Sequence, residues 1–230
     1  MRLDHALRDG VLMAALCLCA AAQTAPGSDA PIKAVEGVPP RAAPTDYQAH
    51  SLVGAVTIGG EFAGHEIPTL EGSLTTEDYV AVEVGFYGPP EARLKLSAED
   101  FWLRINGRKT PLASQPYGLV VKSVKDPLWE PPEEAAAAAA GPKSKTSSKT
   151  SLNSQQPNPA DPKPPPPPVP VAVRRAWTQR VQKAVLPEGD RALPQAGLLF
   201  FWYTGKEKGI QTVDLIYQGP AGTATLKLQR

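Results

Sequence analysis

Alternating apolar and polar residues mark two strands in the first half of the chain. Four apolar residues between Val80 and Phe86 recur at every second position, which is the period of a strand with one buried face. The same alternation over 101–105, followed by Asn106-Gly107, predicts a strand that ends in a two-residue hairpin turn. The glycine-rich stretch 59–64 predicts a mobile turn within a loop that runs to Pro68. Weaker patterns predict strands at 52–58, 93–96 and 118–124.

The pattern changes near the C-terminus. Apolar residues at helical spacing predict one short amphipathic helix from Val173 to Leu186, which Pro187-Glu188-Gly189 ends. The run Leu198 to Tyr203 is apolar on both faces, and such a run is typical of a central strand. Two further strands are expected at 212–217 and 223–228.

Residues 126–172 predict a disordered insert between these two parts. The segment holds an alanine run (135–140), a cationic tract (143–149) and five consecutive prolines (164–168), and its sparse apolar side chains offset little of the entropy of ordering. We interpret the proline run as an extended spacer, with a recognition peptide as the alternative. The cationic tract keeps a linker soluble or, alternatively, contacts an anionic envelope polymer or lipid.

The N-terminal run Val11 to Ala22 fits a signal peptide, with cleavage expected after Ala22 and an uncleaved anchor as the alternative. This predicts an extracytoplasmic protein, periplasmic or secreted, with no stable membrane span after signal removal. Residues 23–46 predict a flexible leader. Both cysteines, Cys17 and Cys19, lie inside the apolar run, so the mature chain is expected to contain neither disulfides nor thiolate chemistry.

The two ordered parts are expected to complete each other. Residues 47–125 would form the first half of a β-sandwich, and residues 173–230 the helix and second half. The C-terminal part is marginal as an independent domain without cysteines, and the interruption costs little because loop-closure entropy grows slowly with length. Two separate small domains are the alternative. The formal net charge of +1 argues against a dedicated nucleic-acid binder.

The predicted fold class is mostly β: an immunoglobulin-like β-sandwich of about seven or eight strands with one short helix. Short motifs within 100–107, 186–189, 197–201 and 213–217 resemble those of uncharacterised immunoglobulin-like domains in bacterial extracytoplasmic proteins and lipoproteins. The resemblance implies a β-sandwich outside the cytoplasm and supplies no known catalytic residues. The chain departs from that family in its long insert, its added helix, and the leucines that precede both cysteines.

Few residues suggest catalysis. After signal removal only His50 and His65 remain as histidines, both expected near the surface, and neither a nucleophile elbow nor a phosphate-binding loop is present. His65 with Glu61 and Glu66 is the one local metal candidate. We therefore predict no catalytic residue, no metal and no cofactor, with an enzyme of unrecognised site as a remaining hypothesis.

Aromatic side chains supply the candidate binding residues: Trp102, Trp129, Trp202 and Tyr203. We expect Trp102 to pack beneath the helix against Trp177; exposed, it would instead stack on a sugar ring or insert into a partner. The function predicted is that of an exported, non-catalytic module for protein interaction or an envelope structural role. Its partner would be an unknown protein or envelope polymer. The alternative is a carbohydrate- or cell-wall-binding module that uses exposed aromatics.

Overall fold

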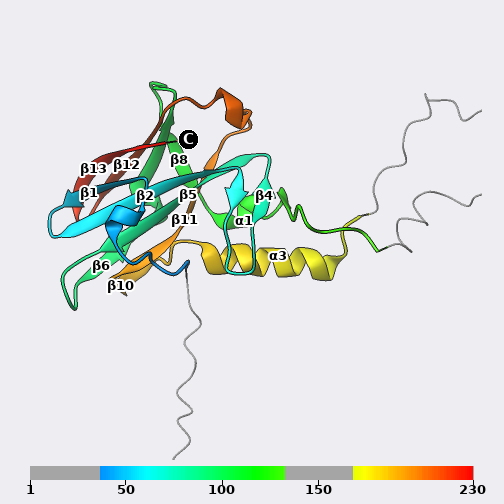
Figure 1. Cartoon of the computed structure of the whole chain (residues 1–230), viewed down its shortest axis with the longest axis horizontal. Helices are drawn as coiled ribbons and strands as arrows, with labels where there is room; N and C mark the ends of the chain where they lie inside the picture. The colour runs from blue at the N-terminus through cyan, green and yellow to red at the C-terminus, as the bar shows by residue number, and fades with distance from the viewer. Residues whose placement is uncertain (1–36, 133–167, 230) are drawn as a thin grey trace, which may run out of the picture. The chain divides into compact units, whose positions relative to one another are not determined.

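The strands predicted around residues 80–86 and 101–105 belong to a large, curved antiparallel sheet (Figure 1). The computed structural model describes residues 37–132 and 168–229, which lie within one compact unit, Ala34–Arg230. This unit is mostly β, as the sequence predicts.

Eight strands form the large sheet, in the order β1-β2-β5-β11-β8-β7-β12-β13. Its two edge strands, β1 and β13, contact each other, so the sheet is nearly closed. Apolar residues from most of these strands fill the interior. The bounds are β1 Ala49–Val53, β2 Val56–Gly64, β5 Tyr79–Tyr87, β7 Phe101–Ile105, β8 Leu112–Gln115, β11 Gln195–Trp202, β12 Val213–Gly219 and β13 Gly222–Leu228.

Strand β11 has a strand on each side, which confirms the prediction of a central strand. It pairs with β5 along its whole length, so segments on both sides of residues 133–167 share one ladder. Leu199 and Phe201 face the interior cluster, whereas Leu198 and Phe200 belong to a second buried cluster on the outer face. The apolar character of both faces follows from this double burial.

Strand β8 joins the two halves of the sheet. Its first two residues, Leu112 and Ala113, pair with β7. Its last two, Ser114 and Gln115, pair with β11. Strand β8 thus connects β7 and β11 within the one nearly closed sheet.

Smaller elements surround the large sheet. Strands β6 (Arg93–Leu96) and β10 (Gly189–Ala192) form a two-stranded antiparallel sheet. Strands β3 (Glu66–Ile67), β4 (Leu74–Thr76) and β9 (Val124–Lys125) form a small three-stranded sheet. The helices are α1 (Tyr117–Val120) and α3 (Val171–Ala184), with short 3-10 turns η1 (Pro44–Asp46), η2 (Ala98–Asp100) and η3 (Glu207–Gly209).

Helix α3 covers the outer cluster, close to the position predicted for it. Trp177, Val181 and Ala184 are buried there at helical spacing. Arg180 anchors the helix through its guanidinium, 2.9 Å from the carboxylate of Asp126. Among the described residues, no helix has the length and apolar character needed to cross a membrane.

The glycine-rich stretch 59–64 lies inside β2 rather than in a mobile turn, and the strand predicted at 52–58 is instead a hairpin that turns at Gly54. Gly59 is directly opposite Gly85 on β5. The ring of Tyr47 packs over both glycines. Their missing side chains make room for an aromatic ring, which is why a glycine pattern here indicates packing instead of a turn.

Ordered structure extends into segments that the sequence assigns to the leader and the insert. Arg41 forms ion pairs with Glu61 and Glu83, and these two carboxylates are cross-strand neighbours on β2 and β5. The Arg41 guanidinium offsets the repulsion between these like charges and so attaches its own segment, residues 37–46, to the sheet. Residues 126–132 and 168–170 are also described beside α3. The cleavage position after Ala22, the rest of the leader and most of the insert lie outside the described residues.

The strand predicted at 118–124 is also wrong. Tyr117–Val120 forms α1, and only Val124 and Lys125 pair in a strand. Val120 is fully buried in the outer cluster. One turn of helix places this valine under α3, whereas the alternation of apolar residues had suggested a strand.

Candidate functional site

Two loops at one end of the large sheet are held together by Asn106. The loops are 106–111, between β7 and β8, and 203–212, between β11 and β12. The Asn106 side chain donates to the Gly209 carbonyl at 2.7 Å and accepts from the amides of Gln211, at 2.7 Å, and Thr212, at 3.2 Å. The predicted Asn-Gly turn forms: Asn106 and Gly107 have positive φ values of 51° and 64°, and the Arg108 amide donates to the Ile105 carbonyl at 3.2 Å. Pairing between β7 and β8 includes Leu112 and Ala113, so the connection is longer than the predicted two-residue hairpin.

His65 ties the second loop to the start of β5, where Tyr79 pairs with Trp202. Its Nδ1 lies 2.7 Å from the Tyr79 carbonyl and its Nε2 lies 3.0 Å from the Gly205 carbonyl. A neutral imidazole can donate to one of these oxygens, and an imidazolium to both. Tyr203 stacks on the His65 ring, and the Tyr203 amide donates to the Asp78 carbonyl at 2.8 Å.

A small cleft opens between these two loops. It has a volume of about 210 Å3 and is lined by Arg108, Leu112, Trp202, Tyr203, Thr204 and Gly205. Trp202 is the last residue of β11 and is 58% exposed, whereas residues 196–201 of that strand are buried. We call this feature the Trp202 cleft. Two of the four predicted binding residues, Trp202 and Tyr203, therefore meet in one place.

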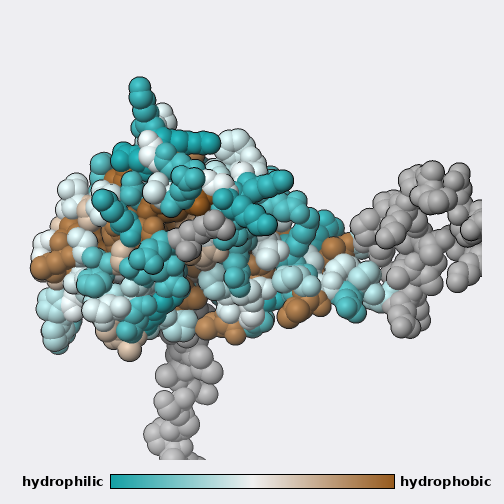
Figure 2. Space-filling model, turned by 45° about the horizontal axis from the view of Figure 1, so that its top comes forward, coloured by the Kyte–Doolittle hydropathy of each residue, from teal (hydrophilic) through white to brown (hydrophobic). Residues whose placement is uncertain are grey.

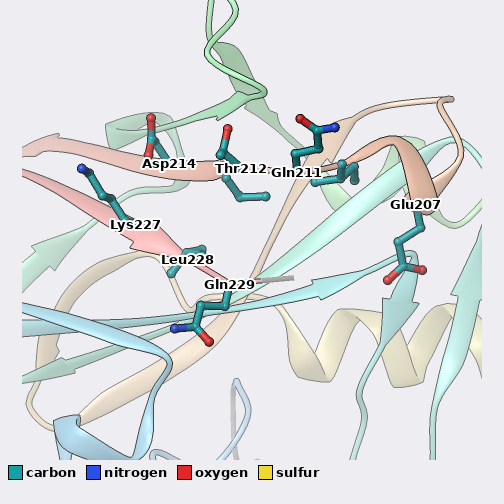
Figure 3. A pocket seen from close by; sticks show the side chains of 9 residues that line it. Glu207, Gln211, Thr212, Asp214, Lys227, Leu228 and Gln229 are labelled. Carbon is teal, nitrogen blue, oxygen red and sulfur yellow. The ribbon is translucent and has the colours of Figure 1, made fainter.

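A wider hollow is lined in part by the C-terminal half of loop 203–212 (Figure 3). Its volume is about 1090 Å3. Asp214 and Lys227 are cross-strand partners on β12 and β13, while Glu207 lies at the far end of the hollow. In Figure 2, which brings the top of Figure 1 forward, hydrophobic surface lies among hydrophilic side chains. The hollow is lined by Glu207, Ile210, Gln211, Thr212, Val213, Asp214, Lys227, Leu228 and Gln229.

A third cavity, of about 510 Å3, lies beside the outer cluster near the C-terminal end of α3. Leu186, Leu198 and Phe200 contribute apolar lining. The Glu188 carboxylate at its margin accepts a hydrogen bond from the Ala98 amide at 3.3 Å. This cavity contains none of the aromatic residues that the sequence proposes for binding.

The other two candidate aromatics lie elsewhere. Trp102 is half-buried on β7, where it faces Ile216 and Ala113 on the neighbouring strands. The prediction that Trp102 packs against Trp177 is wrong. Trp129 occupies that place instead, with its ring centroid 6.0 Å from that of Trp177. Trp129 follows the ordered turn at Asp126 and takes the place beside the helix that the sequence assigned to Trp102.

The histidines and carboxylates proposed for chemistry do not converge. His50 is exposed within β1 rather than before it. Glu61 pairs with Arg41, and both His65 nitrogens face carbonyl oxygens. Residues 37–132 and 168–229 contain no group of three histidine, cysteine or acidic side chains placed to hold a metal.

Sequence reasoning missed Arg108, Leu112 and Thr204 in the Trp202 cleft. No pattern marks them, because their relation to Trp202 arises only from the packing of two loops. No family model, curated protein or solved structure matches the chain. The resemblance to bacterial immunoglobulin-like domains therefore stays a prediction.

Proposed function

We propose that this chain is an exported, non-catalytic binding module with an immunoglobulin-like β-sandwich fold. The sandwich assignment is supported by the way the sheet divides. Strands β1, β2, β5 and β11 form one half, β7, β12 and β13 form the other, and β8 connects them. Each half places apolar residues in the shared interior. Export is supported by the signal-like run that ends at Ala22.

The ligand of this module is an envelope protein or polymer that meets the loop end of the sheet. The observation that carries the proposal is the 58% exposure of Trp202 at the end of a strand whose residues 196–201 are buried. Tryptophan is enriched among the residues that dominate binding energy at interfaces. The surrounding loops are fixed by Asn106 and His65, so little ordering entropy opposes binding.

A non-catalytic role is supported by the types of side chain that line the Trp202 cleft and by the contacts of His65. Its lining holds no carboxylate, histidine or cysteine. His65, the nearest general-base candidate described above, directs both nitrogens at backbone carbonyls. A general base must reach the proton that it removes, and this ring is engaged elsewhere.

A photo-crosslinking amino acid tests the binding role in envelope preparations. One variant carries it at position 202, and the control carries it at Leu52, which is 71% exposed. Leu52 adjoins the β1–β2 turn, and that turn contacts the β12–β13 hairpin at the end of the sheet away from loop 203–212. We expect one discrete product from position 202 alone. Equal crosslinking at both positions, or none, contradicts the proposal.

Carbohydrate is a second candidate class of ligand, favoured by the composition of the Trp202 cleft. An exposed indole offers a flat apolar face, and Arg108 and Thr204 offer polar groups beside it. Quenching of tryptophan fluorescence by soluble wall polysaccharide tests this candidate. We expect Trp202→Ala to abolish the response and Trp129→Phe to retain it, since Trp129 packs against Trp177.

A further inference from the structure

We propose that the Trp202 cleft binds an acidic sugar residue of a polysaccharide, with the ring stacked on Trp202 and its carboxylate held by Arg108. This inference rests on the carbohydrate-binding candidate above and names the class of sugar. Both side chains line the same cleft of about 210 Å3. Three features support it: the positive charge at this end of the sheet, the rigidity of its loops, and a flat indole face beside a cation.

The loop end carries an excess of positive charge. Loops 106–111 and 203–212 contain four cationic side chains, Arg108, Lys109, Lys206 and Lys208, against one carboxylate, Glu207. Within the described residues none of these four cations has an ion-pair partner. The chain as a whole has a formal charge of only +1, so the excess is a local feature.

Glu207 does not neutralise the cleft. It lines the wider hollow (Figure 3), which shares no lining residue with the Trp202 cleft, and its carboxylate lies against Gly64 on β2. Asp78, whose backbone carbonyl accepts from the Tyr203 amide, is not among the residues that line the cleft. The guanidinium of Arg108 is therefore the charged group within the cleft lining.

The floor of the cleft is built before a ligand arrives. Tyr203 is fixed by its stack on His65 and its bond to Asp78, and Asn106 joins the loop that carries Arg108 to the loop that follows Trp202. A preformed site loses little conformational entropy on binding. Exposed Arg108 keeps the freedom to meet a carboxylate with its planar fork of donors.

The combination selects among ligands. A neutral sugar would use the indole but leave the guanidinium without a partner, and an acidic peptide would use the guanidinium but offer no ring to the indole. A uronic acid uses both, because its ring presents a C–H face and its carboxylate accepts paired hydrogen bonds from arginine. Single-stranded nucleic acid also combines rings with negative charge. Proteins bind it in a long groove that follows several phosphates, whereas six residues line this cleft of about 210 Å3.

Titration of the mature protein with oligogalacturonate, followed by tryptophan fluorescence and calorimetry, tests the proposal. The matched neutral ligand is the fully methyl-esterified oligomer. We expect saturable binding of the acidic oligomer, at least about tenfold weaker binding of the ester, and weaker binding as salt rises. Trp202→Ala and Arg108→Gln should each reduce affinity about tenfold or more, and Lys95→Gln on β6 should not. Unchanged thermal melting shows that each variant is folded.

Three outcomes separate this inference from the function on which it rests. Equal binding of both oligomers, unaffected by Arg108→Gln, overturns the acidic class and leaves carbohydrate binding in place. No binding of either oligomer or of neutral wall polysaccharide overturns both. Binding of an oligothymidylate that depends on Trp202, without binding of oligogalacturonate, replaces the sugar with nucleic acid.

Discussion

The Tyr47 ring explains why two positions in the large sheet are glycines. Its ring is 4% exposed and lies over Gly59 and Gly85, and burial raises the pKa of its hydroxyl above the usual tyrosine range. The guanidinium of Arg41 lies over the outer side of the same ring, 4.6 Å from its centroid. The ring thus links residues before β1 to the two strands beneath.

Replacing Gly59 with alanine should destabilise the protein by about 1–3 kcal/mol, the usual cost of overpacking a filled site. A Cβ at this position would lie 2.6 Å from Cδ2 of Tyr47, so the ring must move. Urea unfolding measures the change. Gly118→Ala is the matched control, since nothing lies within 4 Å of its Cβ position; equal stability of the two variants would show that the ring does not need the glycine.

Asp100 gives a prediction for pH dependence. Burial, and then the neighbouring Glu99, raise the pKa of the Asp100 carboxyl above its ordinary value. The folded protein therefore binds this proton more readily than the unfolded chain, so stability increases as pH falls through the folded pKa. At neutral pH the ionised carboxylate costs stability, and Asp100→Asn removes that cost.

We expect Asp100→Asn to raise the urea midpoint at pH 7. The difference from the natural chain should vanish near pH 3, where the carboxyl is mostly protonated in both states because an unfolded aspartate titrates near ~3.9. A gain of equal size at both pH values would show that a new amide hydrogen bond, and not the charge, is responsible.

At the scale of elements, helix α3 depends on one aromatic pair and one partly buried ion pair. Trp177 is 7% exposed and packs edge-to-face on Trp129, and Arg180 pairs with Asp126 at 2.9 Å. Both partners lie just before residue 133, so this part of the chain contacts the helix that follows residue 167. The helix and the turn at 126–129 form one unit.

Trp177→Ala should cost about 3–5 kcal/mol, as expected when a large buried aromatic is truncated. Urea unfolding and hydrogen exchange of α3 amides provide the measurement. Trp202→Ala is the control, because a side chain that is 58% exposed contributes little to folding. A comparable loss in both variants would contradict the division between a core tryptophan and a surface one.

Most elements with a clear period were predictable from sequence. Strands β5, β7, β11, β12 and β13 and helix α3 follow their patterns closely. The failures occur where tertiary contacts override local signals: the glycines of β2 accommodate Tyr47, and α1 buries Val120. In the candidate site, Trp202 and Tyr203 were identifiable as aromatics on a strong strand, but Arg108 reaches them only through loop packing.

For the whole molecule, the ladder between β5 and β11 is the decisive connection. It joins segments that residues 133–167 separate in sequence, and it runs through eight residue pairs from Gln195↔Phe86 to Trp202↔Tyr79. Interior residues from both sides share one cluster, among them Val82 and Leu199. Neither segment alone encloses that cluster.

Cutting the mature protein within residues 133–167, for example with a specific protease at an introduced site, should therefore leave two fragments that co-elute and unfold in one cooperative transition. Size-exclusion chromatography and calorimetry provide the test, and elution in denaturant serves as the control for complete cleavage. Fragments that separate in buffer, each with its own melting transition, would instead support two independent domains.

The position of β11 so late in the chain has a consequence for biosynthesis. A ribosome completes β5 and its neighbour β2 well before Gln195 is made, and at roughly 5–20 residues per second the second edge of β5 stays bare for several seconds. A bare edge of apolar strand is a template for joining other nascent copies. Overproduction should therefore yield inclusion bodies unless a holding chaperone, or a slower translation rate, protects that edge until its partner emerges.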